Sequence, residues 1–235
     1  MKVLAFASQK GGSGKTTLAG HIAVEAERAG AGPIAIIDLD PQGSLSLWSQ
    51  ARATNHPELI TTTEDELVET LAGLAERDFS LVIIDTPPAI TATIGRVIAA
   101  SDLVVIPTRP SPHDLRAAGA TVQLCDRLQK PIAFAINGAA QRARITTEAV
   151  IALSHHGSVA PAIVHQRVDF ASSMIDGRTV MELPGVSRSP EEIQGLWSFL
   201  KDCLEGRVRL RLGSHAGVYT PSTTFGSTLE VKGAA

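Results

Sequence analysis

The segment Lys10–Thr17, KGGSGKTT, limits the possible folds of this chain more than any other part of its 235 residues. An apolar run, Val3–Ala7, precedes it, and a helical pattern, Lys15–Ala29, follows it. A glycine-rich turn between a strand and a helix lets successive backbone N–H groups point into one concavity at the positive helix end, which favours phosphate oxygens. The pattern therefore predicts a nucleotide phosphate loop in which Lys15 reaches the β- and γ-phosphates and the Thr16 hydroxyl binds Mg²⁺.

Two other glycine-rich loops do not fit these residues. The dinucleotide pattern G-x-G-x-x-G finds Thr17 where its third glycine belongs. The standard G-x-x-x-x-G-K-[ST] loop needs a glycine at the position that Gln9 occupies. The segment is instead a variant that begins with a lysine, K-G-G-x-G-K-T-T.

The rest of the chain alternates short apolar runs with stretches long enough for helices. The predicted strands are Val3–Ala7, Ile34–Asp38, Leu81–Asp85, Leu103–Pro107, Ile132–Asn137 and a weaker Ser158–Val164. The clearest helical patterns are Lys15–Ala29, Glu64–Glu76, Asp114–Leu128 and Pro190–Leu204. In most of these strands, apolar and polar residues do not alternate with a period of two. Strands that are buried on both faces of a parallel sheet show the same lack of alternation. We expect an α/β fold with a doubly wound, mostly parallel sheet flanked by helices, in a single domain over residues 1–206.

The last predicted helix has a clear beginning and is followed by a different kind of sequence. Ser189 is expected to cap it and Pro190 to occupy its first turn. Residues 207–235 begin with the basic stretch RVRLRL, which contains Arg207, Arg209 and Arg211, and continue as a Gly-, Ser- and Thr-rich segment. We expect this segment to be a disordered tail.

Composition excludes several classes of protein. Apolar residues make up 44% of the chain, yet no run approaches the roughly 20 residues of a membrane span. The start lacks the core of a signal peptide, and the two cysteines, Cys125 and Cys203, lack the spacing of a metal site. These features predict a cytoplasmic protein without disulfides, zinc ribbon or iron–sulfur cluster.

The net charge of −3 does not indicate a polyanion-binding protein, but the charges are unevenly distributed. Residues 58–78 are acidic, and residues 109–144 hold six arginines and lysines against two aspartates. If the protein binds DNA, a local basic face must do so.

The lysine-first loop resembles that of the ParA/MinD family of deviant Walker A ATPases. The resemblance extends over about residues 2–200. Matching segments are IIDLDPQGSL at Ile36–Leu45, LVIIDTPP at Leu81–Pro88, LVVIPTRPSPHDL at Leu103–Leu115 and the stretch Arg167–Glu182. The loop begins at residue 10, so we expect the short type of ParA protein, without a helix-turn-helix domain ahead of the loop.

Three aspartates are candidates for metal binding and catalysis. Asp85 ends an apolar strand, where a Walker B carboxylate faces the phosphates and holds Mg²⁺. Asp38 and Asp40 lie two residues apart and would share a face in an extended chain. The resemblance implies that Asp40 orients the attacking water, while Asp38 supports Mg²⁺ or the loop. The implied metal site is Thr16, Asp38 and Asp85.

The resemblance also implies roles for two lysines. Lys10 would cross into the nucleotide site of a partner subunit and stabilise charge that develops between the β- and γ-phosphates, so that ATP joins two subunits. The implied catalytic residues are Lys10, Lys15 and Asp40. The implied nucleotide-binding residues are Lys10, Gly11, Gly12, Ser13, Gly14, Lys15, Thr16, Thr17 and Asn137.

Two residues keep two interpretations each. Asn137 follows a predicted strand and is either an adenine contact, as the resemblance implies, or a turn residue before Gly138. Arg167 either touches DNA or pairs with an acidic neighbour.

The resemblance implies an ATP- and Mg²⁺-dependent positioning ATPase. An ATP-bound homodimer would bind DNA non-specifically, and a ParB-like or cargo-bound protein would stimulate hydrolysis. The cargo would be a plasmid, a chromosome region or a protein assembly, and the protein would be associated with the nucleoid. The segment 207–235 lacks the amphipathic helix of MinD-like members, which argues against membrane attachment.

Other functions on the same fold remain as alternatives. They are a small-molecule P-loop ligase, a MinD-like membrane-positioning ATPase and a scaffold that binds ATP but scarcely hydrolyses it. Nothing in the sequence indicates a dead site, because Lys10, Lys15, Thr16, Asp40 and Asp85 are all present.

Overall fold

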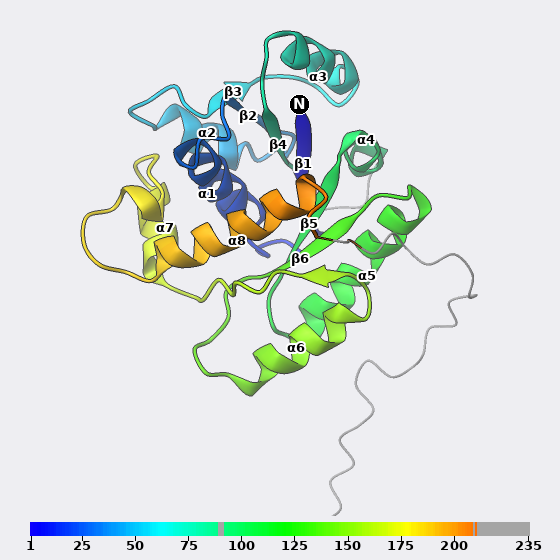
Figure 1. Ribbon diagram of the computed structural model, residues 1–235, viewed down its shortest axis with the longest axis vertical. Coiled ribbons are helices and arrows are strands. Elements are labelled where there is room, and N and C mark those ends of the chain that lie inside the picture. The colour runs from blue at the N-terminus through cyan, green and yellow to red at the C-terminus, as the bar shows by residue number, and fades with distance from the viewer. Residues whose placement is uncertain (89–91, 209, 211–235) are drawn as a thin grey trace, which may run out of the picture.

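The computed structural model describes residues 1–88, 92–208 and 210. Its centre is a parallel sheet with the strand order β3-β2-β4-β1-β5-β6-β7 (Figure 1). The strands are β1 (Lys2–Phe6), β2 (Ile34–Asp38), β3 (Glu58–Ile60), β4 (Leu81–Asp85), β5 (Leu103–Thr108), β6 (Ile132–Ile136) and β7 (Ser158–Val159). From β1 the chain proceeds to β2 and β3 on one side and later to β5, β6 and β7 on the other. The carboxyl end of β1 is therefore the place where an open α/β sheet forms its binding crevice.

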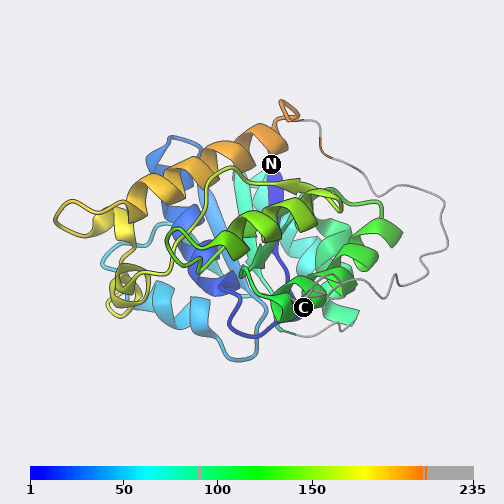
Figure 2. The same ribbon diagram turned by 90° about the horizontal axis from the view of Figure 1, so that it is seen from below.

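Helices cover both faces of the sheet, as the view turned by 90° shows (Figure 2). They are α1 (Lys15–Arg28), α2 (Ser44–Gln50), α3 (Leu67–Glu76), α4 (Ala92–Ala100), α5 (Pro112–Arg127), α6 (Arg144–Ser154), α7 (Val168–Met174), the 3₁₀ turn η1 (Val180–Glu182) and α8 (Ser189–Leu204). Helices α1, α2, α7 and α8 contribute to one buried apolar cluster, and α3, α4, α5 and α6 contribute to the clusters on the other face. The expected doubly wound fold is confirmed.

Burial on both faces explains why the strands show no polar alternation. Leu4 and Phe6 of β1 belong to the cluster under α1 and α8, while Val3 and Ala5 belong to the cluster under α3 and α4. Successive side chains of a strand point to opposite faces, and both faces here are covered by helices. All five residues of β4 are buried for the same reason.

The structure corrects several expected boundaries. Helix α8 begins at Ser189 itself, and its N-cap is Arg188, so Ser189 is not the cap. The Ser189 hydroxyl instead donates to Asp169, 3.2 Å away. The weak strand expected over Ser158–Val164 is only the two-residue β7. Short β3 and α2 were not predicted, because neither contains a long apolar pattern.

Only the first part of the expected basic tail lies within the described residues. Arg207 forms ion pairs with Asp202, at 2.8 Å, and with Glu205. Val208 and Leu210 pack against the apolar cluster under α8. Arg209 and the segment 211–235, for which we expect disorder, lie outside the described residues.

Candidate nucleotide site

The loop between β1 and α1 has a backbone that requires glycine. Gly12 and Gly14 have φ angles of 72° and 99°, in the left-handed region that side chains with a Cβ rarely adopt. A Cβ on Gly14 would lie 2.0 Å from Nδ2 of Asn137. That amide donates a hydrogen bond to the Ser13 carbonyl oxygen at 2.7 Å. Asn137, which follows β6, therefore holds the loop from the other side of the crevice.

Lys15 and Thr16 begin α1 and direct their side chains to the carboxyl end of β4. Lys15 is only 6% exposed, and burial lowers the pKa of its amine, while Asp85 and Asp40 partly offset that effect. The Thr16 hydroxyl donates to Asp85 Oδ2 at 2.5 Å. The phosphate-loop lysine and threonine and the Walker B aspartate are therefore brought together as expected.

The Asp85 carboxyl group is fully buried at the end of β4. Burial raises its pKa to about 7, and the nearby Asp38 and Asp40 add to this rise, while the hydrogen bond from Thr16 and the charge of Lys15 oppose it. A cation bound at this point would stabilise the ionised carboxylate.

The side chains around Asp85 fit Mg²⁺, which prefers oxygen ligands and keeps waters and substrate phosphates in its shell. Thr16 and Asp85 would hold it, directly or through water, together with nucleotide phosphates. Within residues 1–88, 92–208 and 210, no group of three or more His, Cys, Asp and Glu side chains is arranged to hold a metal by itself. The buried Ser13 hydroxyl, which has no hydrogen-bond partner, is a further polar group in the loop.

Asp38 and Asp40 do not share a face, because β2 ends at Asp38 and a turn follows. The two Asp38 oxygens accept the backbone N–H groups of Asp40, at 3.1 Å, and of Ser46, at 2.8 Å. Asp38 therefore supports the turn that carries Asp40. Asp38 also lies opposite Asp85 in the register of β2 and β4, so it stays close to the expected metal position. One Asp40 oxygen accepts the backbone N–H of Gln42 at 3.0 Å.

Two expected site residues lie at the border of this arrangement. Lys10 is exposed, with its backbone N–H bonded to the Ser8 hydroxyl at 3.2 Å. Arg167 forms an ion pair with Glu192 of α8 at 2.6 Å, so the acidic-neighbour interpretation is correct. His165 contacts the same carboxylate through Nδ1 at 2.8 Å.

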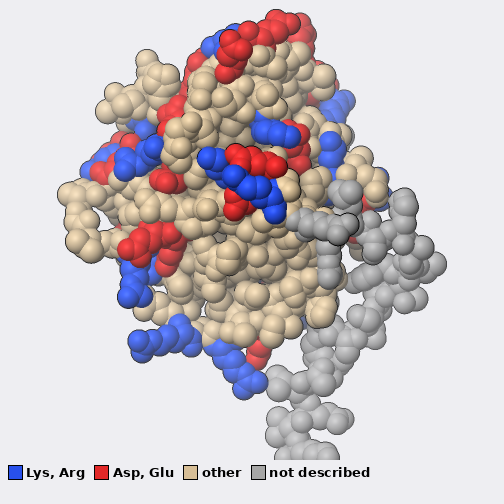
Figure 3. Space-filling model, in the orientation of Figure 1, with Lys and Arg blue, Asp and Glu red and all other residues tan. Residues whose placement is uncertain are grey.

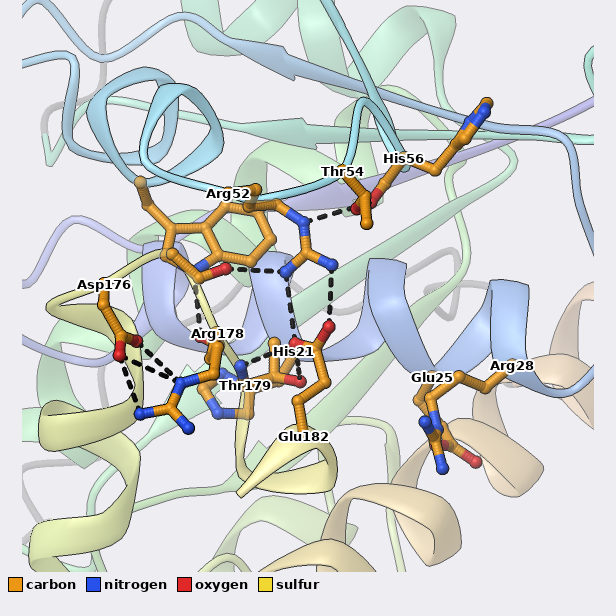
Figure 4. A network of polar contacts seen from close by, with 12 residues as sticks. His21, Glu25, Arg28, Arg52, Thr54, His56, Asp176, Arg178, Thr179 and Glu182 are labelled. Atoms are coloured by element: carbon orange, nitrogen blue, oxygen red, sulfur yellow. Dashed lines mark hydrogen bonds and ion pairs between the residues drawn. The ribbon is translucent and has the colours of Figure 1, made fainter. Parts of the chain in front are cut away.

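A polar network that no sequence pattern indicated joins α1 to the segment 176–182 (Figure 4). His21 Nδ1 lies 2.7 Å from the Thr17 carbonyl oxygen, and its Nε2 accepts the Val180 N–H at 3.2 Å. Arg52 donates to both Glu182 oxygens, at 2.9 and 3.2 Å. Arg52 and Glu182 are 130 residues apart and His21 and Val180 are 159 residues apart, so no local pattern could have paired them.

Residues 4–180 match the CobQ/CobB/MinD/ParA nucleotide binding domain, and the chain belongs to this family. Its ParA and MinD members are P-loop ATPases, which agrees with the assembled loop, lysine and aspartates.

Two curated relatives are maintenance of carboxysome distribution protein A from different bacteria. The Gloeobacter kilaueensis protein is 39% identical over 52% of this chain and 55% of its own length. The Halothiobacillus neapolitanus protein is 27% identical over 79% of this chain and 89% of its own length. The protein ParA of Rhizobium radiobacter is 34% identical over 58% of this chain and 63% of its own length.

Solved structures share the fold at low sequence identity. Apo McdA of Cyanothece has a TM-score of 0.70 at 17% identity, over 85% of this chain and 99% of its own. The septum site-determining protein MinD of Pyrococcus horikoshii, complexed with Mg-ADP, has a TM-score of 0.71 at 13% identity, over 88% of this chain and 99% of its own. No helix within the described residues is long and apolar enough to cross a membrane.

Proposed function

We propose that this protein is a ParA-like positioning ATPase that forms an ATP-dependent homodimer, binds DNA non-specifically and moves a cargo. The observation that carries the proposal is the exposed Lys10 on a phosphate loop whose other groups, Lys15, Thr16 and Asp85, are already assembled. An exposed lysine at this place is free to reach a second nucleotide site, and the relatives in carboxysome distribution and partition support a positioning role.

The residues of one subunit provide most of the hydrolytic site. The loop N–H groups and Lys15 bind the β- and γ-phosphates. Thr16 and Asp85 would hold Mg²⁺, which would neutralise part of the phosphate charge. Asp40 stands on the turn that Asp38 braces, from which its carboxylate orients the attacking water. Asn137 lies on the adenine side of the crevice.

Lys10 of the partner subunit completes the site. Its ammonium group lies between the β- and γ-phosphates, where charge accumulates during hydrolysis. Few catalytic groups act before a partner arrives, so intrinsic turnover is slow. A ParB-like or cargo-bound protein accelerates hydrolysis, which releases the dimer from DNA near the cargo.

Co-sedimentation with DNA tests this proposal. The purified protein is mixed with unrelated duplex sequences with ATP, with ADP or without nucleotide, at two salt concentrations. We expect pelleting that needs ATP, ignores sequence and weakens with salt, as counterion release requires. Asp40→Ala should remain on DNA with ATP, and Lys15→Ala should lose nucleotide binding. Lys201→Ala on α8 is the matched lysine control and should behave as wild type.

Two results would overturn the proposal. ATP turnover accelerated by a metabolite, without DNA binding, would identify a small-molecule ligase. ATP-dependent binding to lipid vesicles instead of DNA would identify a MinD-like positioning ATPase.

A further inference from the structure

A small open cavity lies at the amino end of α6, beside the chain that follows β7. Its volume is about 310 Å³. Residues of the loop before α6 and of the first turn of α6 form one wall, and Ile163 and His165 form the other. The nucleotide loop described above contributes none of the lining residues.

The electrostatic field at this cavity is positive for two reasons. Arg142 and Arg144 line it and are both exposed. The N-cap of α6, Ala143, provides no side chain to accept the free N–H groups of the first turn, which carry the positive end of the helix dipole. Figure 3 shows Lys and Arg side chains gathered at this lower edge of the molecule, over the beginning of α6.

A buried hydroxyl group in the cavity wall lacks a partner. Thr146 lines the cavity, is 7% exposed, and its Oγ1 makes no hydrogen bond. Buried polar groups in folded proteins are nearly always hydrogen-bonded, and leaving one unpaired is destabilising. The backbone N–H of Thr146 is already used, donating to the Ala143 carbonyl oxygen at 3.0 Å. The hydroxyl is an unused donor beside the cavity, and an acceptor oxygen that reaches the first turn of α6 would satisfy it.

Two guanidinium groups, a hydroxyl and a helix amino end together suit a phosphate, which offers several acceptor oxygens to donors from different directions. One internal competitor is present. Arg144 Nε lies 3.0 Å from Glu148 Oε1, but both side chains are more than half exposed, and such pairs contribute little. A phosphate can therefore replace Glu148 as the partner of Arg144.

We infer that this cavity binds a backbone phosphate of duplex DNA, and the inference rests on the proposed function. The cavity is shallow and open to solvent, and its arginines are exposed, so a phosphate that belongs to a long polymer can enter it. Its two arginines belong to the basic stretch 109–144, whereas the acidic stretch 58–78 includes the strand at the other edge of the sheet. The contact fixes the position of the DNA and reads no sequence.

Three variants separate the charge from the hydroxyl. Arg142→Asn removes one charge, and asparagine tolerates the positive φ of 55° at this position. Arg144→Gln removes the second charge. Its control is Glu148→Gln, which breaks the Arg144–Glu148 ion pair but keeps the arginine. Thr146→Val removes only the hydroxyl. Arg77→Gln, an exposed arginine paired with Glu58 in the acidic region, is the control for loss of one charge elsewhere.

DNA affinity is measured with ATP over a series of salt concentrations. We expect each arginine variant to bind about 10-fold more weakly and its log–log salt slope to become less steep by about 0.9. Thr146→Val should bind about 3- to 10-fold more weakly with an unchanged slope, because it loses a hydrogen bond and no charge. Without DNA, Thr146→Val should be at least as stable as wild type, because it removes an unpaired buried hydroxyl, and its ATP turnover should be unchanged.

Each other outcome overturns the inference in a recognisable way. If wild type binds DNA and the cavity variants bind equally well, the cavity is not a DNA contact and the proposed function stands. If wild type binds no DNA with any nucleotide, both the proposed function and the inference about the cavity fail. If inorganic phosphate alone protects the first turn of α6 from amide exchange and DNA does not, the cavity takes a free phosphate compound. If the variants change ATP affinity instead, the cavity belongs to the nucleotide site.

Discussion

Buried His21 should make the stability of the fold fall in mild acid. Burial lowers the pKa of its imidazole from the ordinary 6.5 to about 4, although the hydrogen bond to Thr17 and the charge of Glu182 oppose this shift. Because Nε2 accepts the Val180 N–H, the proton of the neutral ring is assigned to Nδ1. A second proton would break that contact. Between pH 6.5 and about 4 the unfolded chain binds more protons, so stability decreases as pH falls.

The size of this effect follows from the two pKa values. Between about pH 7.5 and about pH 5, a shift from 6.5 to about 4 removes about 2 kcal/mol of unfolding free energy. Urea unfolding at the two pH values measures the loss. Asp85, whose pKa is raised to about 7, also titrates in this range, and its protonation increases stability as pH falls. The wild type must therefore be compared with a variant that lacks only the imidazole.

His21→Gln provides that comparison, because its amide can accept the Val180 N–H and donate to the Thr17 carbonyl oxygen without titrating. The pH-dependent loss should be about 2 kcal/mol smaller in His21→Gln than in wild type. His113→Gln, which removes an exposed imidazole on α5, should retain the wild-type dependence. An equal loss in wild type and His21→Gln would refute the assignment of this acid sensitivity to His21.

Other contacts give further expectations. Arg52→Leu leaves the Glu182 carboxylate without its partner and should reduce unfolding free energy by about 3 kcal/mol in urea, with partial recovery when Glu182→Gln is added. Gly177→Ala should lower the melting temperature markedly, because Gly177 has a φ of 77° and an added Cβ would lie 2.4 Å from the Arg52 backbone nitrogen. Chelation of Mg²⁺ should weaken ATP binding by at least about 10-fold in calorimetric titration, because Asp85 and Asp40 repel the phosphates; unchanged affinity would contradict the metal site.

The parts of this protein that sequence could predict are those with a local chemical pattern. The phosphate loop depends on glycines and a lysine within eight residues, and buried parallel strands depend on continuous apolar runs. Both were predicted, and Thr16 and Asp85 meet because β1 and β4 are neighbours in the sheet.

The parts of the site that the sequence could not predict depend on tertiary contacts. Asp38 and Asp40 were placed on one face on the assumption of an extended chain, but β2 ends at Asp38, and the Asp38 carboxylate accepts backbone N–H groups of the segment that follows. Asn137 was assigned only to adenine or to a turn, although its amide also holds the phosphate loop from a position 124 residues away. Sequence spacing has no information on such contacts.

The separation of charge along the sheet explains how the proposed DNA binding is compatible with a net charge of −3. The acidic region 58–78 includes β3, one outer strand, while the phosphate cavity adjoins the chain after β7, the other outer strand. Six strand spacings of about 4.8 Å separate these two strands, a distance of about 29 Å. Figure 3 shows acidic side chains along the top of the molecule, basic ones along its lower edge over α6, and both signs between them. Since the Debye length is about 10 Å at 0.1 M salt, the acidic end cannot cancel the field at the basic end. The proposed DNA binding therefore depends on the local arginines, and the total charge is a poor guide to it.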